Sequence, residues 1–197
     1  MLVWIGLSAG QASLRVAVWR KLRSLGALPV QSSVYLLPER PLVVREVRRL
    51  LDRVAREGGT GRSLRIAMVE PAEQAGLIEE LNAARDEEYR EVLERLPSFR
   101  AEIAAERARG RASYAEVEES EADLDRFRAW LAKIDARDYY AAPTGADARA
   151  ELERCAGVLA DFEAEALQAE APPLPVGRRL RAVRGGRPAG DDAVGSG

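Results

Sequence analysis

The chain has 197 residues, of which 47% are hydrophobic and 31% charged, and its formal net charge is −2. One cysteine, Cys155, and no histidine exclude a disulfide framework, a zinc site of the cysteine/histidine type and an imidazole general base. No apolar run approaches the roughly 18 residues that cross a membrane, and the opening MLVWIGL is too short for a signal peptide. We therefore expect a cytoplasmic protein without metal, cofactor or membrane contact.

Charge is distributed unevenly along the chain. Residues 1–70 carry 12 Arg and Lys against 5 Asp and Glu, whereas residues 71–170 carry 13 against 25. Residues 171–197 are basic again, with 5 Arg against 2 Asp. This asymmetry predicts two units with different surfaces. An alternative is that the acidic part docks on the basic part.

The first 70 residues alternate between strand and helix patterns. Strands are expected at residues 2–7, 28–31, 34–37 and 63–70, with a turn at Ser32-Ser33. A helix with an apolar stripe from Leu14 to Leu25 ends at Gly26, and a second helix begins near Pro41. The order predicts a ferredoxin-like βαββαβ domain in residues 1–70, with both helices on one face of the sheet.

After residue 70 the pattern is helical. We expect an all-α domain over residues 71–170, with Pro97 kinking or restarting the first helix, a connection at 108–113 and a break at 143–145. Residues 171–197 are rich in Pro, Gly and Arg without periodicity, which predicts a disordered basic tail. The expected fold class is therefore α+β.

Nothing in the sequence gives positive evidence for catalysis, so we expect no enzyme. Acidic pairs such as Glu118-Glu119 and the run at residues 86–88 are interpreted as solvated helix faces. Cys155 lies on an apolar helix stripe and is interpreted as a core residue.

The two N-terminal helices offer a candidate binding surface, because their polar sides are rich in arginine. A positive face of this kind suits phosphates or an oxyanion, although a solvated face or a dock for the acidic half explains it too. The residues expected to make these contacts are Arg20, Arg23, Arg45, Arg48 and Arg49.

A second candidate lies in the stretch KIDARDYYAA at a predicted helix end. Lys133, Arg137, Asp138 and Tyr139 either line a ligand pocket or pack this helix end against the sheet domain, with the tyrosine hydroxyl bonded at the rim.

Two segments, WRKLRSLGA at residues 19–27 and SVYLLP at residues 33–38, carry a resemblance to a known family. They resemble the N-terminal domain of the chromate-resistance regulator ChrB, and the likeness extends over residues 2–168 through ARDEEYREVL and LAKIDARDYYAA. The piece around Gln31 and Ser33 is also similar to the middle domain of the phenylacetate repressor PaaX. A further likeness is to the ferredoxin-like small subunit of the CRISPR adaptation complex. That subunit has a nuclease aspartate where this chain has Ser8, which argues against nuclease chemistry.

The resemblance implies a non-catalytic regulatory or accessory protein of chromate resistance. It would bind DNA or a chromate-like oxyanion through the basic face, and an exposed sheet edge favours a homodimer. The side chains of Gln31 and Ser33 are expected to satisfy backbone groups at the strand turn. The alternative function is a structural or protein-interaction module without nucleic-acid binding.

Overall fold

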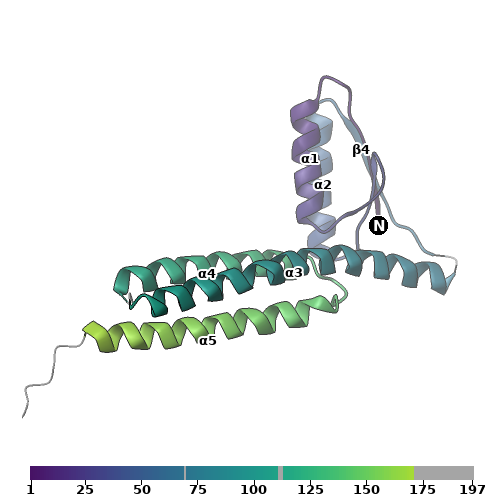
Figure 1. The fold of residues 1–197 in the computed structure, drawn as a ribbon. Coiled ribbons are helices and arrows are strands. Elements are labelled where there is room, and N and C mark those ends of the chain that lie inside the picture. Colours follow the sequence, from purple (N-terminus) through teal and green to yellow (C-terminus); the bar gives the residue numbers. More distant parts are fainter. Residues whose placement is uncertain (69, 111–112, 171–197) are drawn as a thin grey trace, which may run out of the picture.

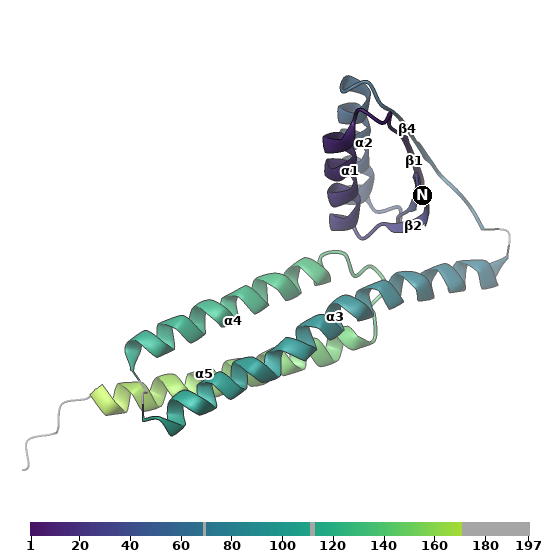
Figure 2. The same cartoon turned by 45° about the horizontal axis from the view of Figure 1, so that its top comes forward.

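The computed structural model describes residues 1–68, 70–110 and 113–170. The tail predicted at residues 171–197 lies outside the described residues. The chain is α+β, with a small sheet unit followed by three long helices, as Figures 1 and 2 show.

The N-terminal unit follows the order strand, helix, strand, strand, helix, strand. Its elements are β1 (Leu2–Gly6), α1 (Ala12–Ser24), β2 (Leu28–Gln31), β3 (Val34–Leu36), α2 (Pro41–Arg56) and β4 (Thr60–Leu64). The four strands form one sheet in the order β2-β3-β1-β4, and every neighbouring pair is antiparallel. Both helices cover the same face of this sheet (Figure 2).

The period-2 alternation of β1 places its side chains on two faces. Val3 and Ile5 are buried under the helices, whereas Trp4 between them points to the other face and is 42% exposed. The helices bury the stripes that their spacing predicts. This first hydrophobic cluster comprises Val3, Ile5, Leu14, Val18, Leu22, Leu25, Leu37, Val43, Val47, Leu50 and Val54.

The last strand, β4, begins at Thr60, earlier than the predicted span of 63–70. The glycines after α2 were expected only to end the helix, but one of them belongs to the strand. Gly58, with φ +81°, does end it, but Gly61 pairs with Ile5 inside β4. A Cβ at Gly61 would lie 2.6 Å from Leu51 Cδ2, so glycine is what lets β4 run directly against α2. Residues 65–68 form no strand.

The turn between β2 and β3 consists of Ser32 and Ser33, as predicted. Its polar side chains do not play the expected role, because neither Gln31 nor Ser33 makes a side-chain hydrogen bond to any described residue. The backbone carbonyl of Ser33 instead accepts a hydrogen bond from the Ile5 N–H at 2.9 Å. Serine is a common turn residue, and here it forms the turn without a side-chain hydrogen bond from Ser33.

The helical half is a bundle of α3 (Pro71–Ala108), α4 (Tyr114–Asp135) and α5 (Thr144–Glu170), and each helix contacts the other two. Helix α3 continues through Pro97, so of the predicted kink or restart the restart is wrong and the kink stays a prediction. Leu96 and Phe99 on either side of this proline are buried in the bundle core, and that packing offsets the lost backbone hydrogen bond. Ser113 caps α4 by accepting a hydrogen bond from the Glu116 N–H.

No helix in the described residues is long and apolar enough to cross a membrane. Nor do His, Cys, Asp and Glu side chains gather into a group of three suited to a metal ion within those same residues.

Cys155 is fully buried in the bundle core, where its Sγ lies 3.9 Å from the Leu96 carbonyl. Burial, and next the charge of Glu151, raise the pKa of this thiol. We expect Cys155 to react with Ellman's reagent at pH 8 at least about tenfold more slowly in the native protein than in urea. Equal rates in the two states would show that the thiol is accessible.

Candidate nucleic-acid interface

Ion pairs centred on Glu46 join α1 to α2, and we call this contact the seam. Lys21 Nζ lies 2.7 Å from Glu46 Oε2, which connects the two helices. Arg49 Nη1 lies 2.7 Å from Glu46 Oε1, and Arg45 Nε lies 3.9 Å from the same oxygen. One carboxylate, only 17% exposed, therefore stands among three cations and leaves the seam with an excess of positive charge.

The five predicted arginines are all exposed, but they do not form one cluster. Arg45, Arg48 and Arg49 together line a shallow hollow of about 500 Å³ on α2. Arg20 on α1 and Arg48 make no hydrogen bond or ion pair with any described residue, which leaves both guanidinium groups to solvent.

Arg23 is directed elsewhere. Its guanidinium carbon lies 5.4 Å from the centroid of the Trp19 ring, a cation–π contact. Both side chains line a cleft whose opposite wall carries Glu87, Glu88 and Glu91 of α3. We therefore define the basic face as Arg20, Lys21, Arg45, Arg48 and Arg49, without Arg23.

The acidic half does not neutralise this face. Among the described residues, no Arg or Lys of α1 or α2 forms an ion pair with a carboxylate of α3, α4 or α5. The side chains of Arg45 and Arg49 remain 59% and 68% exposed. The alternative in which the acidic half docks on the basic half is therefore supported only at Arg23, which faces the acidic wall of α3, and not at Arg45 or Arg49.

Glu46 gives the seam a pH dependence. Its pKa is lowered, first by the hydrogen bond from Lys21 and then by the charges of Lys21 and Arg49. A carboxylate with a lowered folded pKa stabilises the fold above its ordinary pKa of about 4.3, and the contribution is lost as pH falls through the lower folded value. We expect Glu46→Gln to be less stable than wild type at pH 6 and to lose less stability below pH 4.3. Chemical unfolding at several pH values measures this, and Glu79→Gln, an exposed glutamate without an ion pair, should follow wild type.

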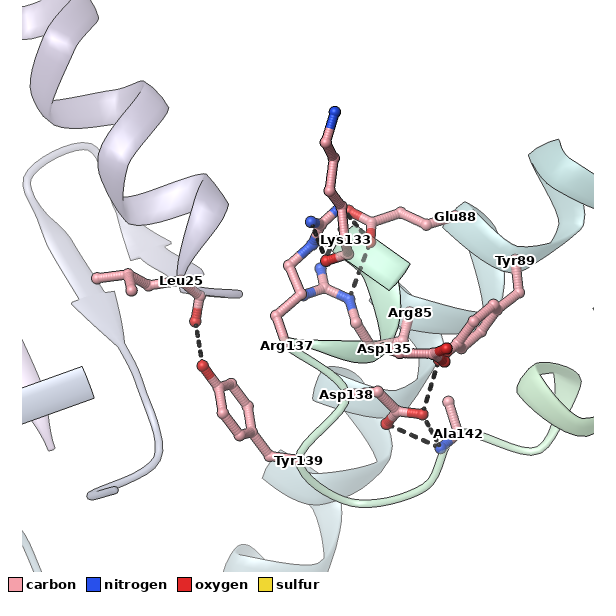
Figure 3. Close-up of polar contacts among 10 residues, drawn as sticks. All are labelled: Leu25, Arg85, Glu88, Tyr89, Lys133, Asp135, Arg137, Asp138, Tyr139 and Ala142. Atoms are coloured by element: carbon pink, nitrogen blue, oxygen red, sulfur yellow. Dashed lines mark hydrogen bonds and ion pairs between the residues drawn. The ribbon is translucent and has the colours of Figure 1, made fainter. Parts of the chain in front are cut away.

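The second candidate, around the end of α4, lies where the two halves of the molecule meet (Figure 3). The Tyr139 hydroxyl donates a hydrogen bond to the Leu25 carbonyl at the end of α1, at 3.1 Å. Its ring packs against the first hydrophobic cluster, and burial raises its pKa. Tyr139 thus ties the bundle to the sheet unit.

Beside this tyrosine lies a nearly buried ion-pair network. Arg137 Nη2 lies 2.9 Å from Glu88 Oε2, and Arg85 Nε lies 3.3 Å from the same oxygen. The Arg85 side chain is only 9% exposed, and burial is the main cause of its lowered pKa. Gly26, with φ +70°, closes α1 directly over this pair, because a Cβ there would lie 2.7 Å from Arg85 Nη1.

A third set of contacts fixes the loop between α4 and α5. The Tyr89 hydroxyl lies 2.7 Å from Asp135 Oδ1 and 3.1 Å from Asp138 Oδ2. Asp138 also accepts a hydrogen bond from the Ala142 N–H at 3.0 Å. Burial, followed by the hydrogen bond to Asp135, raises the pKa of Tyr89.

The four residues predicted at this position therefore do not share one partner. Lys133 contributes only its carbonyl, which accepts a hydrogen bond from Arg137 Nη1 at 2.6 Å, and its amine points away from the group (Figure 3). Arg137, Asp138 and Tyr139 are each held by another part of the protein. These contacts agree with the second of the two interpretations given above, in which these residues pack the helix end and do not line a ligand pocket.

The chain matches the model of a family described as "Protein ChrB, N-terminal" over residues 15–172. It belongs to the ChrB N-terminal family. The match covers about four-fifths of the 197 residues, from α1 to the end of the bundle, and places the chain in the regulatory context of chromate resistance. Comparison with curated proteins and with solved structures finds no match.

Sequence reasoning missed the partners that organise this ChrB-family chain. Asp86 and Glu88 are not solvated, because Asp86 accepts a hydrogen bond from the Thr144 N–H at 2.8 Å and Glu88 holds two arginines. A signal was present, since Arg85 stands at helical spacing between Leu81 and Tyr89 on the buried stripe of α3. An arginine on an apolar stripe, three residues before a glutamate, indicates a buried ion pair.

Proposed function

We propose that this ChrB-family chain is a non-catalytic regulatory or accessory protein that binds DNA through the basic face of α1 and α2. The observation that carries the proposal is the excess of exposed positive charge on α1 and α2: Arg20 and Arg48 pair with no described residue, and Arg45 and Arg49 share the single carboxylate of Glu46 with Lys21. Exposed arginines on adjacent helices suit the phosphate backbone of DNA. They position the duplex without reading its sequence.

We further propose that the N-terminal unit is a ferredoxin-like domain. The support is its βαββαβ element order, the strand order β2-β3-β1-β4 and the placement of both helices on one face. Such a unit presents α1 and α2 as a rigid pair. Lys21 and Glu46 link the two helices above their shared core, so a ligand as long as a duplex can contact arginines on both.

A chromate-like oxyanion fits the same face less well. A small dianion needs donors that converge on one point, whereas the closest cations here converge on Glu46. The Glu46 carboxylate occupies that point and would repel an anion placed there. A duplex meets the flanking arginines instead, and its phosphates need not approach the carboxylate.

A homodimer is proposed as the binding form. Strands β2 and β4 are the two edges of the sheet that the described residues form, and the outer side of an edge strand can pair with a strand of a second copy. Pairing of two copies along one edge would place two basic faces on one assembly. Sedimentation equilibrium of the intact chain tests this, and a monomeric mass at 100 µM would contradict it.

Titration of the intact protein into a fluorescein-labelled duplex, across 25–300 mM salt, tests the main proposal. We expect the logarithm of the association constant to fall linearly with the logarithm of salt concentration. A slope of about −2.7 to −4.5 corresponds to three to five phosphate contacts. An absence of binding at the lowest salt would leave the protein-interaction module as the better account. Added chromate should compete no better than sulfate.

A further inference from the structure

A groove crosses the end of the bundle where α4 begins and α5 ends. Its volume is about 340 Å³, and Tyr114, Val117, Ala166 and Leu167 make up its apolar side. Val117 and Ala166 are buried in the bundle core, whereas Leu167 is 50% exposed at the end of the α5 stripe. The groove thus continues the core out to the surface.

Three carboxylates line the same groove, namely Glu118 and Glu121 from α4 and Glu163 from α5. All three are exposed, and none pairs with a cation among the described residues. The neighbouring Glu165 of α5, by contrast, pairs with Arg107 at 3.0 Å. Unpaired carboxylates beside apolar surface are complementary to a peptide that alternates arginine with aliphatic residues.

The chain itself supplies such a peptide directly after α5. Residues 178–187 read RRLRAVRGGR, with five arginines, one leucine and one valine and no acid. Helices α4 and α5 run in opposite directions, so α5 ends at the same end of the bundle as α4 begins (Figure 1). The seven intervening residues, 171–177, span at most about 23 Å at roughly 3.3 Å each, which is enough to turn back over the groove.

We propose that residues 178–187 of this chain bind intramolecularly in the groove between α4 and α5. The arginines pair with Glu118, Glu121 and Glu163, while the aliphatic side chains cover Leu167. The short tether gives the segment a high effective concentration at the groove. This inference does not depend on DNA binding by the basic face. It gives a role to the three groove carboxylates, which take no part in the DNA-binding proposal.

Paramagnetic relaxation in the intact protein tests the proposal. A spin label on Ala182→Cys is specific, because Cys155 is buried. Even an unbound segment stays near its tether, at about 20 Å root-mean-square for the twelve residues after position 170, so proximity alone decides nothing. The informative quantity is the change in amide broadening at residues 114–121 and 163–167 when the acids are neutralised.

We expect Glu118→Gln/Glu121→Gln/Glu163→Gln to reduce that broadening at least threefold, and 500 mM salt to do the same. Glu79→Gln/Glu80→Gln/Glu94→Gln removes three exposed, unpaired acids of α3 and should leave the broadening unchanged. Equal broadening in wild type and in the groove variant would overturn the proposal. So would broadening that appears only between labelled and unlabelled chains in a mixture, because the segment would then bind a second copy.

Discussion

Replacing Arg20, Arg45, Arg48 and Arg49 together with alanine should weaken binding to duplex DNA at least about a hundredfold at 100 mM salt. Each guanidinium that neutralises a phosphate releases condensed counterions, so losing four contacts lowers the salt slope by about 3.6 as well as the affinity. The four side chains are exposed and lie outside the first hydrophobic cluster, so the variant should remain folded. Fluorescence anisotropy across a salt series measures both quantities.

A matched variant separates the basic face from net charge. Arg90, Arg109, Arg126 and Arg128 are four exposed arginines of the bundle, each paired with an acid three residues earlier. Their replacement with alanine removes the same charge and should change the affinity by less than about fivefold, because distant exposed charges are largely screened. An equal loss in the two variants would mean that DNA responds to overall charge and not to α1 and α2.

The second large effect is expected at Gly26, the residue that closes α1 over the junction. Gly26→Ala should lower the free energy of unfolding by about 2–4 kcal/mol. A non-glycine residue at φ +70° costs roughly 1–2 kcal/mol, and the new Cβ would lie 2.7 Å from Arg85 Nη1 and 3.2 Å from the Arg137 carbonyl. Displacing a nearly buried arginine from Glu88 adds to this cost. Urea unfolding measures the change.

Gly157→Ala is the matched control for that prediction. Gly157 lies inside α5, where an added Cβ would meet no atom within 4 Å, and its φ is not positive. Alanine is favoured over glycine in a helix by about 0.5–1 kcal/mol, so this substitution should stabilise the protein. If Gly26→Ala were as stable as wild type, the close packing of α1 on Arg85 and Arg137 would be wrong.

Much of the N-terminal unit could be predicted because its core positions repeat with simple periods. The stripe from Leu14 to Leu25, the stop at Gly26 and the turn at Ser32-Ser33 follow from local rules and are all present. The last strand was misplaced because the glycine at position 61 was interpreted as part of a helix stop. It is required instead by the close approach of Leu51, a contact between elements that no local pattern reveals. For the same kind of reason α3 passes through Pro97, where the bundle core overrides a local helix breaker.

The sequence predicted which arginines of the candidate site are exposed, but not which of them lie together. Helical spacing identifies the arginines as exposed, yet it does not reveal that Glu46 gathers Lys21, Arg45 and Arg49, since Lys21 belongs to a different helix. It also does not separate Arg23, whose direction is set by Trp19 and by the acidic wall of α3. Contacts between residues distant in sequence, such as Tyr139 with Leu25, required the structure.

The most direct test of the central claim is the footprint of duplex DNA on the intact protein, read as amide chemical-shift changes at 50 mM salt. We predict that the largest changes fall in α1 and α2, at Arg20, Lys21, Arg45, Arg48 and Arg49, with small changes in α4 and α5. Changes concentrated in the bundle, with α1 and α2 unaffected, would contradict the proposal that these helices bind the phosphate backbone.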